Sequence, residues 1–104
     1  MTITSNRSSD GRELTIGVEG RFDFSSHQSF REACSQGDPE RTRFIIDLSR
    51  TDYVDSSALG MLLLLRQRTG GGRDRIRLRG FGPEVRRIFE ISHFDQLFDM
   101  EPAP

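Results

Sequence analysis

Residues 43–68 read RFIIDLSRTDYVDSSALGMLLLLRQR, and this stretch decides which class of fold the chain can adopt. Its first six residues are almost continuously apolar, which is typical of a central strand with both faces covered. Residues 51–55 are expected to form a connection. The residues from Ser56 to Arg68 are mostly strong helix formers, and Asp55 or Ser56 can cap the helix that they predict. A buried strand that leads into such a helix indicates an α/β domain.

Patterns before this stretch predict extended structure and a further helix. Residues 14–18 alternate between apolar and polar side chains, as a strand with one buried face does. After a glycine, residues 21–24 resume the extended pattern, either as a second strand paired with the first or as its continuation around a bend. Ser25 and Ser26 then form an N-cap signal for a helix that is expected to end near Gly37.

Patterns after this stretch predict a strand and a last helix. Residues 75–79 alternate Arg with apolar side chains, which predicts a strand with one solvent-facing side. Pro83 suits the first position of a helix whose apolar stripe begins at Val85. A short apolar segment at 94–98 precedes an acidic tail. Because strands alternate with helices, we expect one α/β domain with a mixed sheet.

The composition excludes several classes of protein. The chain has 104 residues, one Cys, and 15 basic against 16 acidic residues, and all of the basic residues are Arg. One Cys excludes a disulfide framework and a multi-Cys metal site, and a balanced charge disfavours nucleic-acid binding by bulk electrostatics. The N-terminus lacks the apolar region of a signal peptide, and the longest apolar run, residues 61–65, is far short of the roughly 20 residues that span a bilayer. We therefore expect a cytoplasmic protein without membrane insertion or direct contact with nucleic acid.

Enzymatic motifs are weak in this sequence. His27 and His93 match no metal motif, and no Gly-rich phosphate loop or G-x-S-x-G elbow occurs. A hydrolase that uses Ser57 is disfavoured because no His is placed to act as its base. Some Asp residues could form a catalytic pair, although Asp is also common at turns: Asp23, Asp47, Asp52 and Asp55. We therefore expect no enzymatic activity, no cofactor and no metal.

A cluster of Arg residues between 66 and 79 has two interpretations. Six Arg residues in this segment face only one acidic residue, Asp74. They could form a docking face for an acidic partner. The favoured alternative is a charge bias at the end of a helix followed by the solvent-facing side of an edge strand, where charge discourages edge pairing.

The segment VDSSALG at residues 54–60 places two hydroxyl groups at the start of a helix directly after a strand. Free backbone N–H groups and the positive end of the helix dipole stabilise an anion at such a position. A phosphate on Ser57 would therefore be tolerated without melting the helix, and it would add roughly −1.5 to −2 charges beside Asp55. The plain alternative is that Ser56 is an N-cap and Ser57 an ordinary residue of the first turn.

Residues 55–60, DSSALG, resemble the signature of the STAS domain found in bacterial anti-sigma factor antagonists. The resemblance extends over nearly the whole chain. Residues 20–23, GRFD, look like the family's Gly-x-x-Asp, and residues 44–48, FIIDL, look like its central strand. Residues 82–89, GPEVRRIF, resemble its third-helix pattern. Residues 91–94, ISHF, stand where the family has an apolar-Ser-Gly-apolar run, with His in place of the Gly.

This resemblance implies a fold and a function. The implied fold is a single STAS-like domain over residues 1–104, with a mixed sheet of about four to five strands, helices mainly on one face, and flexible ends at 1–11 and 99–104. The implied function is a binding switch: Ser57 is phosphorylated by an anti-sigma factor that is also a serine kinase, and a serine phosphatase reverses this. The unphosphorylated protein would bind the anti-sigma factor, and phosphorylation would break the complex.

The resemblance also assigns residues to the switch. Asp23, Asp55 and Ser56 are expected to surround Ser57. The partner face is expected to include the first turns of the helix and the turn before the first helix, with the residues Phe24, Ser25, Ser26, Ala58, Gly60 and Met61. Two alternatives remain within the family: a switch that acts on another signalling protein such as a diguanylate cyclase, and a constitutive STAS subunit of a transporter complex.

Overall fold

A six-stranded sheet forms the centre of the computed structural model, which describes residues 2–104. The strands are β1 (Thr2–Arg7), β2 (Glu13–Phe22), β3 (Arg43–Asp47), β4 (Thr51–Val54), β5 (Ile76–Arg79) and β6 (Asp99–Glu101). The helices are α1 (His27–Cys34), α2 (Ser56–Arg68) and α3 (Pro83–Ile91), joined by the 3-10 turns η1 (Phe24–Ser26), η2 (Arg73–Arg75) and η3 (Phe94–Gln96).

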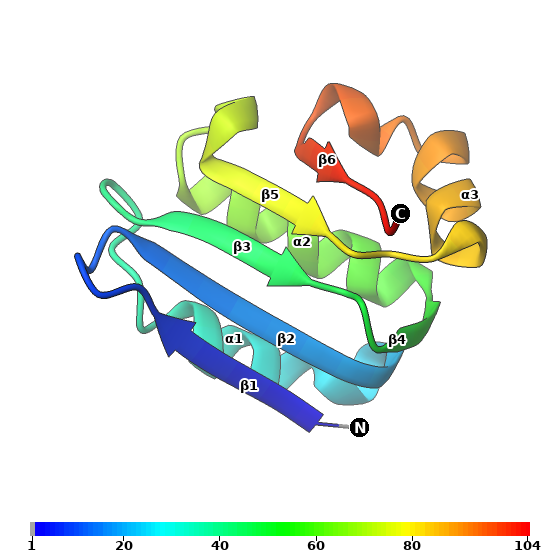
Figure 1. The fold of residues 1–104 in the computed structure, drawn as a ribbon, viewed down its shortest axis with the longest axis horizontal. Helices are drawn as coiled ribbons and strands as arrows, with labels where there is room; N and C mark the ends of the chain where they lie inside the picture. The colour runs from blue at the N-terminus through cyan, green and yellow to red at the C-terminus, as the bar shows by residue number, and fades with distance from the viewer. Residues whose placement is uncertain (1) are drawn as a thin grey trace.

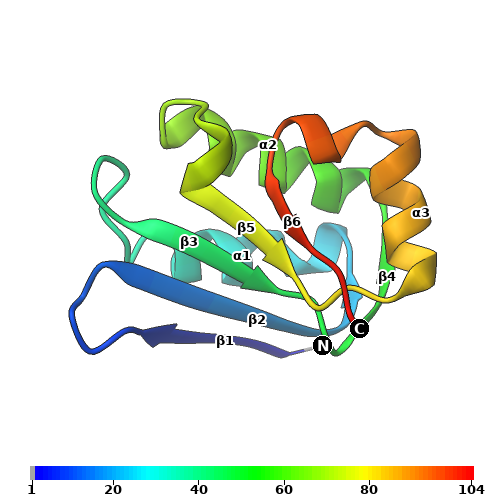
Figure 2. The ribbon, with the colours of Figure 1, turned by 45° about the horizontal axis from the view of Figure 1, so that its top comes forward.

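The sheet is mixed, and helices cover one of its faces. Its order is β1-β2-β3-β5-β6, in which β1 is antiparallel to β2 and the other neighbours are parallel. The short β4 pairs with the end of β2, beyond the stretch that β3 occupies. α1 and α2 lie behind the sheet in Figure 1, and α3 lies beside β4 at one end of it (Figure 2). This arrangement confirms the predicted fold class.

The apolar alternation seen in the sequence builds the core. The alternating buried positions of β2, β3 and β5 point toward α1 and α2, and the residues between them are polar or half-exposed on the open face, except for Ile45 of β3, which is 5% exposed. A second set of rings, Phe81, Phe89, Phe94 and Phe98, packs with centroids 5.1–5.5 Å apart between α3 and the C-terminal segment. The segment predicted only as apolar is thereby part of the core.

The sheet is larger than the predicted four to five strands. β1 and β6 lie in the segments expected to be flexible ends, and β4 occupies most of the segment expected to be a connection. β4 is held by its buried Thr51, whose hydroxyl donates a hydrogen bond of 2.6 Å to the carbonyl of Val18. These strands are short or largely polar, so their alternation was too weak to be seen in the sequence.

Residues 21–22 continue β2, which is the second of the two predicted alternatives, and the register with β4 shifts between Gly20 and Arg21, where the φ of 85° at Gly20 suits glycine. One element boundary differs from the prediction. α1 ends at Cys34, before Gly37. Within the described residues, each helix is too short or too polar to cross a bilayer.

Candidate functional site at the start of α2

Two segments far apart in the chain meet at one edge of the sheet. Phe22 and Val54 are partners in the parallel pairing of β2 and β4. Asp55, the residue directly after β4, donates its backbone N–H to the carbonyl of Phe22 at 3.3 Å. Because Asp23 and Asp55 each follow a paired residue, η1 and the first turn of α2 begin side by side.

Asp55 caps α2. Its carboxylate accepts a hydrogen bond from the N–H of Ala58 at 2.9 Å, and its carbonyl accepts one from Leu59 at 3.1 Å. Of the two cap candidates in the sequence, Asp55 therefore takes the role, and Ser56 is the first helical residue. Ser56 is exposed and Ser57 is half-buried. Neither hydroxyl makes a hydrogen bond to another group within residues 2–104.

Asp23 caps η1 in a reciprocal arrangement. Its carboxylate accepts hydrogen bonds from the N–H of Ser25 at 3.0 Å and from the Ser25 hydroxyl at 2.6 Å. In return, the N–H of Asp23 donates to the Ser26 hydroxyl at 3.2 Å, and that hydroxyl donates to the carbonyl of Arg21 at 3.3 Å. The Ser25 hydroxyl bond lowers the pKa of Asp23, which keeps it ionised. The serines thus shape η1, and Ser26 makes no side-chain cap to α1.

The residues expected to face a partner divide into two groups. Phe24 is 74% exposed and stacks on His27, Ser25 is exposed, and Gly60 is half-exposed. Ser26 and Ala58 are fully buried, so their side chains support the surface without forming it, and Met61 is 6% exposed. Beside them on α2, Leu63 and Leu64 are 41% and 55% exposed. The sequence pattern did not identify Leu63 and Leu64 as exposed, because an unbroken apolar run does not indicate which side of the helix faces solvent.

Arg21 and Tyr53 flank the same edge and were also missed. The Arg21 guanidinium lies 4.3 Å from the centroid of the Tyr53 ring and 3.5 Å from the Asp23 carboxylate. Register pairing of the two residues across β2 and β4 produces this contact. No local sequence signal could have revealed it, because β4 was not predicted.

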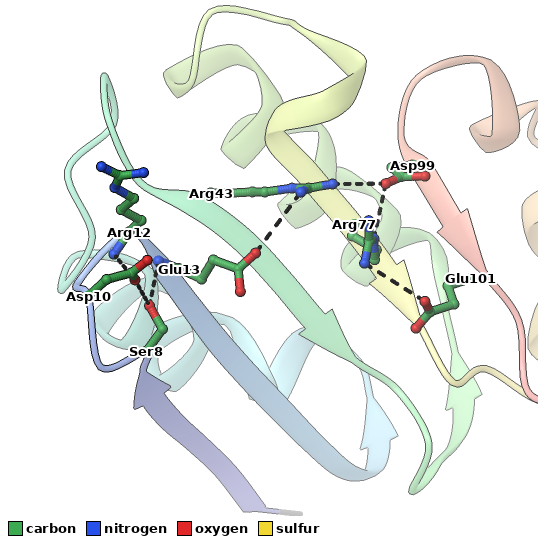
Figure 3. Close-up of polar contacts among 8 residues, drawn as sticks. All are labelled: Ser8, Asp10, Arg12, Glu13, Arg43, Arg77, Asp99 and Glu101. Atoms are coloured by element: carbon green, nitrogen blue, oxygen red, sulfur yellow. Dashed lines mark hydrogen bonds and ion pairs between the residues drawn. The ribbon is translucent and has the colours of Figure 1, made fainter.

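The Arg residues between 66 and 79 do not form one docking face. β5 is not an edge strand, because β6 covers it, and Arg77 binds Asp99 at 3.0 Å and Glu101 at 3.8 Å (Figure 3). Asp99 also accepts from Arg43 at 3.1 Å, which extends this network across the open face of the sheet. Four other Arg residues of the cluster bind groups elsewhere. Arg66 donates to the carbonyl of Leu97, and Arg73 donates to the carbonyl of Asp95. Arg75 donates to the carbonyls of Pro39, Thr42 and Thr69, and Arg79 donates to the carboxylate of Asp47.

The other candidate residues lie apart from one another. His27 begins α1, whereas His93 follows α3 in the left-handed conformation with φ 57°. Asp47 binds Arg79 at 3.4 Å, and Asp52 is exposed on β4. Partial burial opposes ionisation of Asp47, but hydrogen bonds from Ser49 and Arg79 outweigh it and lower its pKa. Only Asp23 and Asp55 among the four Asp candidates meet at the start of α2.

Comparison with known proteins relates the whole chain to one kind of domain. The family model described as "Mlab, STAS domain" matches residues 5–100. A STAS-domain containing protein of Pseudomonas aeruginosa (strain UCBPP-PA14) is 52% identical over 98 residues, which are 94% of this chain and 97% of that protein. The crystal structure of an anti-sigma factor antagonist STAS domain from Rhodobacter sphaeroides is 33% identical, with a TM-score of 0.51 over 76% of this chain and 85% of that chain.

More distant structures share the fold over almost the full length. The anti-sigma factor antagonist SpoIIAA in its unphosphorylated form has a TM-score of 0.69 at 19% identity, covering 99% of this chain and 90% of its own. SpoIIAA of Bacillus in the phosphorylated form has a TM-score of 0.66 at 19% identity, covering 99% and 92%. The fold is therefore that of the anti-sigma factor antagonists, as the sequence resemblance implied.

Proposed function

Because the chain belongs to the STAS-domain family, we propose that it is an anti-sigma factor antagonist whose binding is switched off by phosphorylation of Ser57. The observation that carries this proposal is the position of the Ser57 hydroxyl. It lies in the first turn of α2, is partly accessible, and has no intramolecular hydrogen-bond partner within residues 2–104. A kinase can therefore modify it without breaking an existing bond of the fold.

The start of α2 suits a phosphate that leaves the fold intact. Asp55 engages the N–H of Ala58, which leaves the earlier N–H groups of the helix available to an anion. A related fold, SpoIIAA, is known in both unphosphorylated and phosphorylated forms. We expect the same tolerance here, so that modification changes the surface and not the stability of the domain.

A phosphate on Ser57 would change the local charge strongly. It brings roughly −1.5 to −2 charges to an edge that already carries the carboxylates of Asp23 and Asp55. A partner surface fitted to the neutral hydroxyl would meet repulsion and an unpaired polar group, which cost about 1–3 kcal/mol. At about 1.4 kcal/mol per tenfold change, binding would weaken by one to two orders of magnitude.

The proposed partners follow from the family. They are an anti-sigma factor with serine kinase activity, which the unphosphorylated protein binds, and a serine phosphatase that restores binding. The proposed place of action is the cytoplasm. The exposed residues near Ser57, namely Phe24, Ser25 and Gly60, are proposed to contact the anti-sigma factor, and Asp23, Asp55 and Ser56 to surround the phosphosite.

The test is a phosphorylation and binding experiment with matched serine variants. The protein is incubated with candidate serine kinases and ATP, and the phosphate is located by mass spectrometry. Binding to the anti-sigma factor is then measured for Ser57→Ala and Ser57→Asp, with Ser56→Asp as the control for charge at the neighbouring residue. We expect phosphate on Ser57, retained binding by Ser57→Ala, and binding weakened at least about tenfold by Ser57→Asp.

Two results would contradict the proposal. One is modification confined to other residues. The other is equal partner binding by Ser57→Ala and Ser57→Asp, which would identify Ser57 as an ordinary first-turn residue of a constitutive STAS subunit. Retained switching with a diguanylate cyclase or another signalling protein, and not with an anti-sigma factor, would preserve the role of Ser57 but replace the partner.

A further inference from the structure

A groove of about 350 Å³ lies between α1 and α2. Residues of both helices line it: His27, Phe30, Arg31, Cys34, Met61, Leu64, Leu65, Gln67 and Arg68. It begins one helical turn beyond Ser57, at Met61, and runs toward the C-terminal end of α2. Its volume falls in the range in which proteins accommodate inserted side chains or small ligands.

The floor and one wall of the groove are apolar. Phe30, Cys34 and Leu65 are each 3% exposed and form the floor, and Leu64 stands on the wall with 55% of its surface exposed. α2 also buries Leu62, so over residues 61–65 the helix carries apolar side chains on all sides. Helices that are apolar all round are normally covered on all sides. The outer side of α2 is exposed, which favours a binding partner that packs against it.

The rim of the groove is basic. Arg31 stands on α1 and Arg68 on α2, and both are exposed. Neither has an ion-pair partner within residues 2–104, whereas Arg43, Arg77 and Arg79 are all paired on the opposite face of the sheet. None of the lining residues is acidic. The groove therefore combines an apolar floor with two uncompensated positive charges.

We propose that this groove binds an amphipathic helix of a protein partner. Apolar side chains of that helix would enter between α1 and α2 and cover Leu64, and its Glu or Asp side chains would meet Arg31 and Arg68. This is the helix-in-groove mode of recognition, with charge complementarity selecting an acidic partner. The inference goes beyond the Ser57 switch, because it needs no phosphate and stands on different residues.

The test uses the full chain and two synthetic peptides. Both peptides have Leu at helical positions i, i+3, i+4 and i+7; one carries Glu at the flanking positions and the other carries Lys. Backbone amide shifts of the isotope-labelled protein are followed by NMR during each titration. We expect the Glu peptide to shift the amides of Phe30, Met61 and Leu64, and the Lys peptide to bind at least about tenfold more weakly.

Variants of the protein separate apolar contact from charge. Leu64→Glu should weaken binding of the Glu peptide at least about tenfold, because it places a charge in the apolar seam beside a like charge. Its matched control is Ile91→Glu, which changes another exposed apolar residue, on α3. The double change Arg31→Glu with Arg68→Glu should reverse the preference in favour of the Lys peptide, whereas Arg87→Glu on α3 should not.

Three results of the peptide titrations would overturn the proposal. They are equal affinity for the two peptides, shifts that map outside the groove, and no binding of either peptide. Self-association measured by sedimentation, if Leu64→Glu abolishes it, would assign the groove to a second copy of this chain and would also overturn it. Because Ser57 is unchanged in every variant, these results are independent of the outcome for the phosphorylation switch.

Discussion

The backbone N–H of Asp55 donates a 3.3 Å hydrogen bond to the carbonyl of Phe22, and this bond joins the ends of β2 and β4. It places Asp23 of the η1 cap beside Asp55 of the α2 cap, although the two lie on opposite sides of α1 and β3 in the sequence. Both carboxylates act as helix caps: that of Asp23 accepts from the N–H of Ser25, and that of Asp55 accepts from the N–H of Ala58. The acidic edge around Ser57 is therefore held rigidly by backbone geometry.

Replacing Asp55 with Ala should destabilise the domain. The side chain satisfies the N–H of Ala58, and loss of such an N-cap costs about 1 kcal/mol in free energy of unfolding. Asp55→Asn, which retains a cap acceptor, should recover most of the loss. Urea unfolding measures all variants. Asp52→Ala serves as the control, because Asp52 is exposed, and it should change stability by less than about 0.5 kcal/mol. An equal effect of the two Ala variants would contradict the capping role.

Removing the Ser25 hydroxyl should raise the pKa of Asp23. The hydroxyl bond is the largest cause that lowers this pKa, so in Ser25→Ala it should return toward the ordinary value of about 3.9. Because folding lowers the pKa of Asp23, its ionised carboxylate stabilises the fold above about pH 4. This stabilisation is lost as the pH falls through the pKa of Asp23 in the folded protein. Carbon-detected NMR titration measures the pKa. Asp47, whose pKa Ser49 and Arg79 lower, should titrate unchanged in the variant.

Replacing His93 with Gly should stabilise the domain. His93 has φ 57°, a left-handed conformation that side chains disfavour, and it stands where the STAS pattern has Gly. Relief of strain of about 1–2 kcal/mol exceeds the entropic cost of Gly of about 0.5–1 kcal/mol, so the free energy of unfolding should rise by up to about 1.5 kcal/mol. Ser92→Gly, at φ −85°, should lower it instead. Thermal unfolding of the two variants measures these changes in stability. A loss of stability in both variants would contradict backbone strain at His93.

The Cys34 thiol should react very slowly in the folded protein. Burial raises its pKa to about 12, although Arg68 opposes this. At pH 8 its thiolate fraction is then on the order of a thousandfold below that of a free thiol, whose pKa is about 8.5. Alkylation followed by mass spectrometry measures the rate, which should become normal in urea. The control is Cys34→Ala combined with Ser35→Cys, whose exposed thiol should react at the ordinary rate when folded; a fast reaction of Cys34 itself would contradict its burial.

The sequence predicted the parts of this fold that local patterns specify. The alternation of residues 14–18, the apolar run of β3 and the helix formers of α2 each produced a correct element, because strand and helix periods are visible within one segment. Asp55 was a correct cap candidate for the same reason. β1, β4 and β6 were not predicted, since their residues become strands only through pairing with β2 and β5.

The site was predicted only in part because solvent exposure is a property of the whole fold. Ser26, Ala58 and Met61 were expected on the partner face and are buried, whereas Leu63 and Leu64, which were not assigned to that face, are exposed. The Arg cluster looked continuous in sequence, yet its members turn to different faces and most bind groups on other elements. Such contacts join residues that are distant in the chain, and no local pattern encodes them.

By itself, the sequence determined an α/β domain of the STAS type with Ser57 in the first turn of a capped helix, because capping, periodicity and the DSSALG signature are all local. The tertiary structure decided that Asp23 joins Asp55 at that turn, and that α1 and α2 leave a basic-rimmed apolar groove between them. Strand pairing and helix packing bring these residues together, and both depend on burial of the common core rather than on neighbours in the chain.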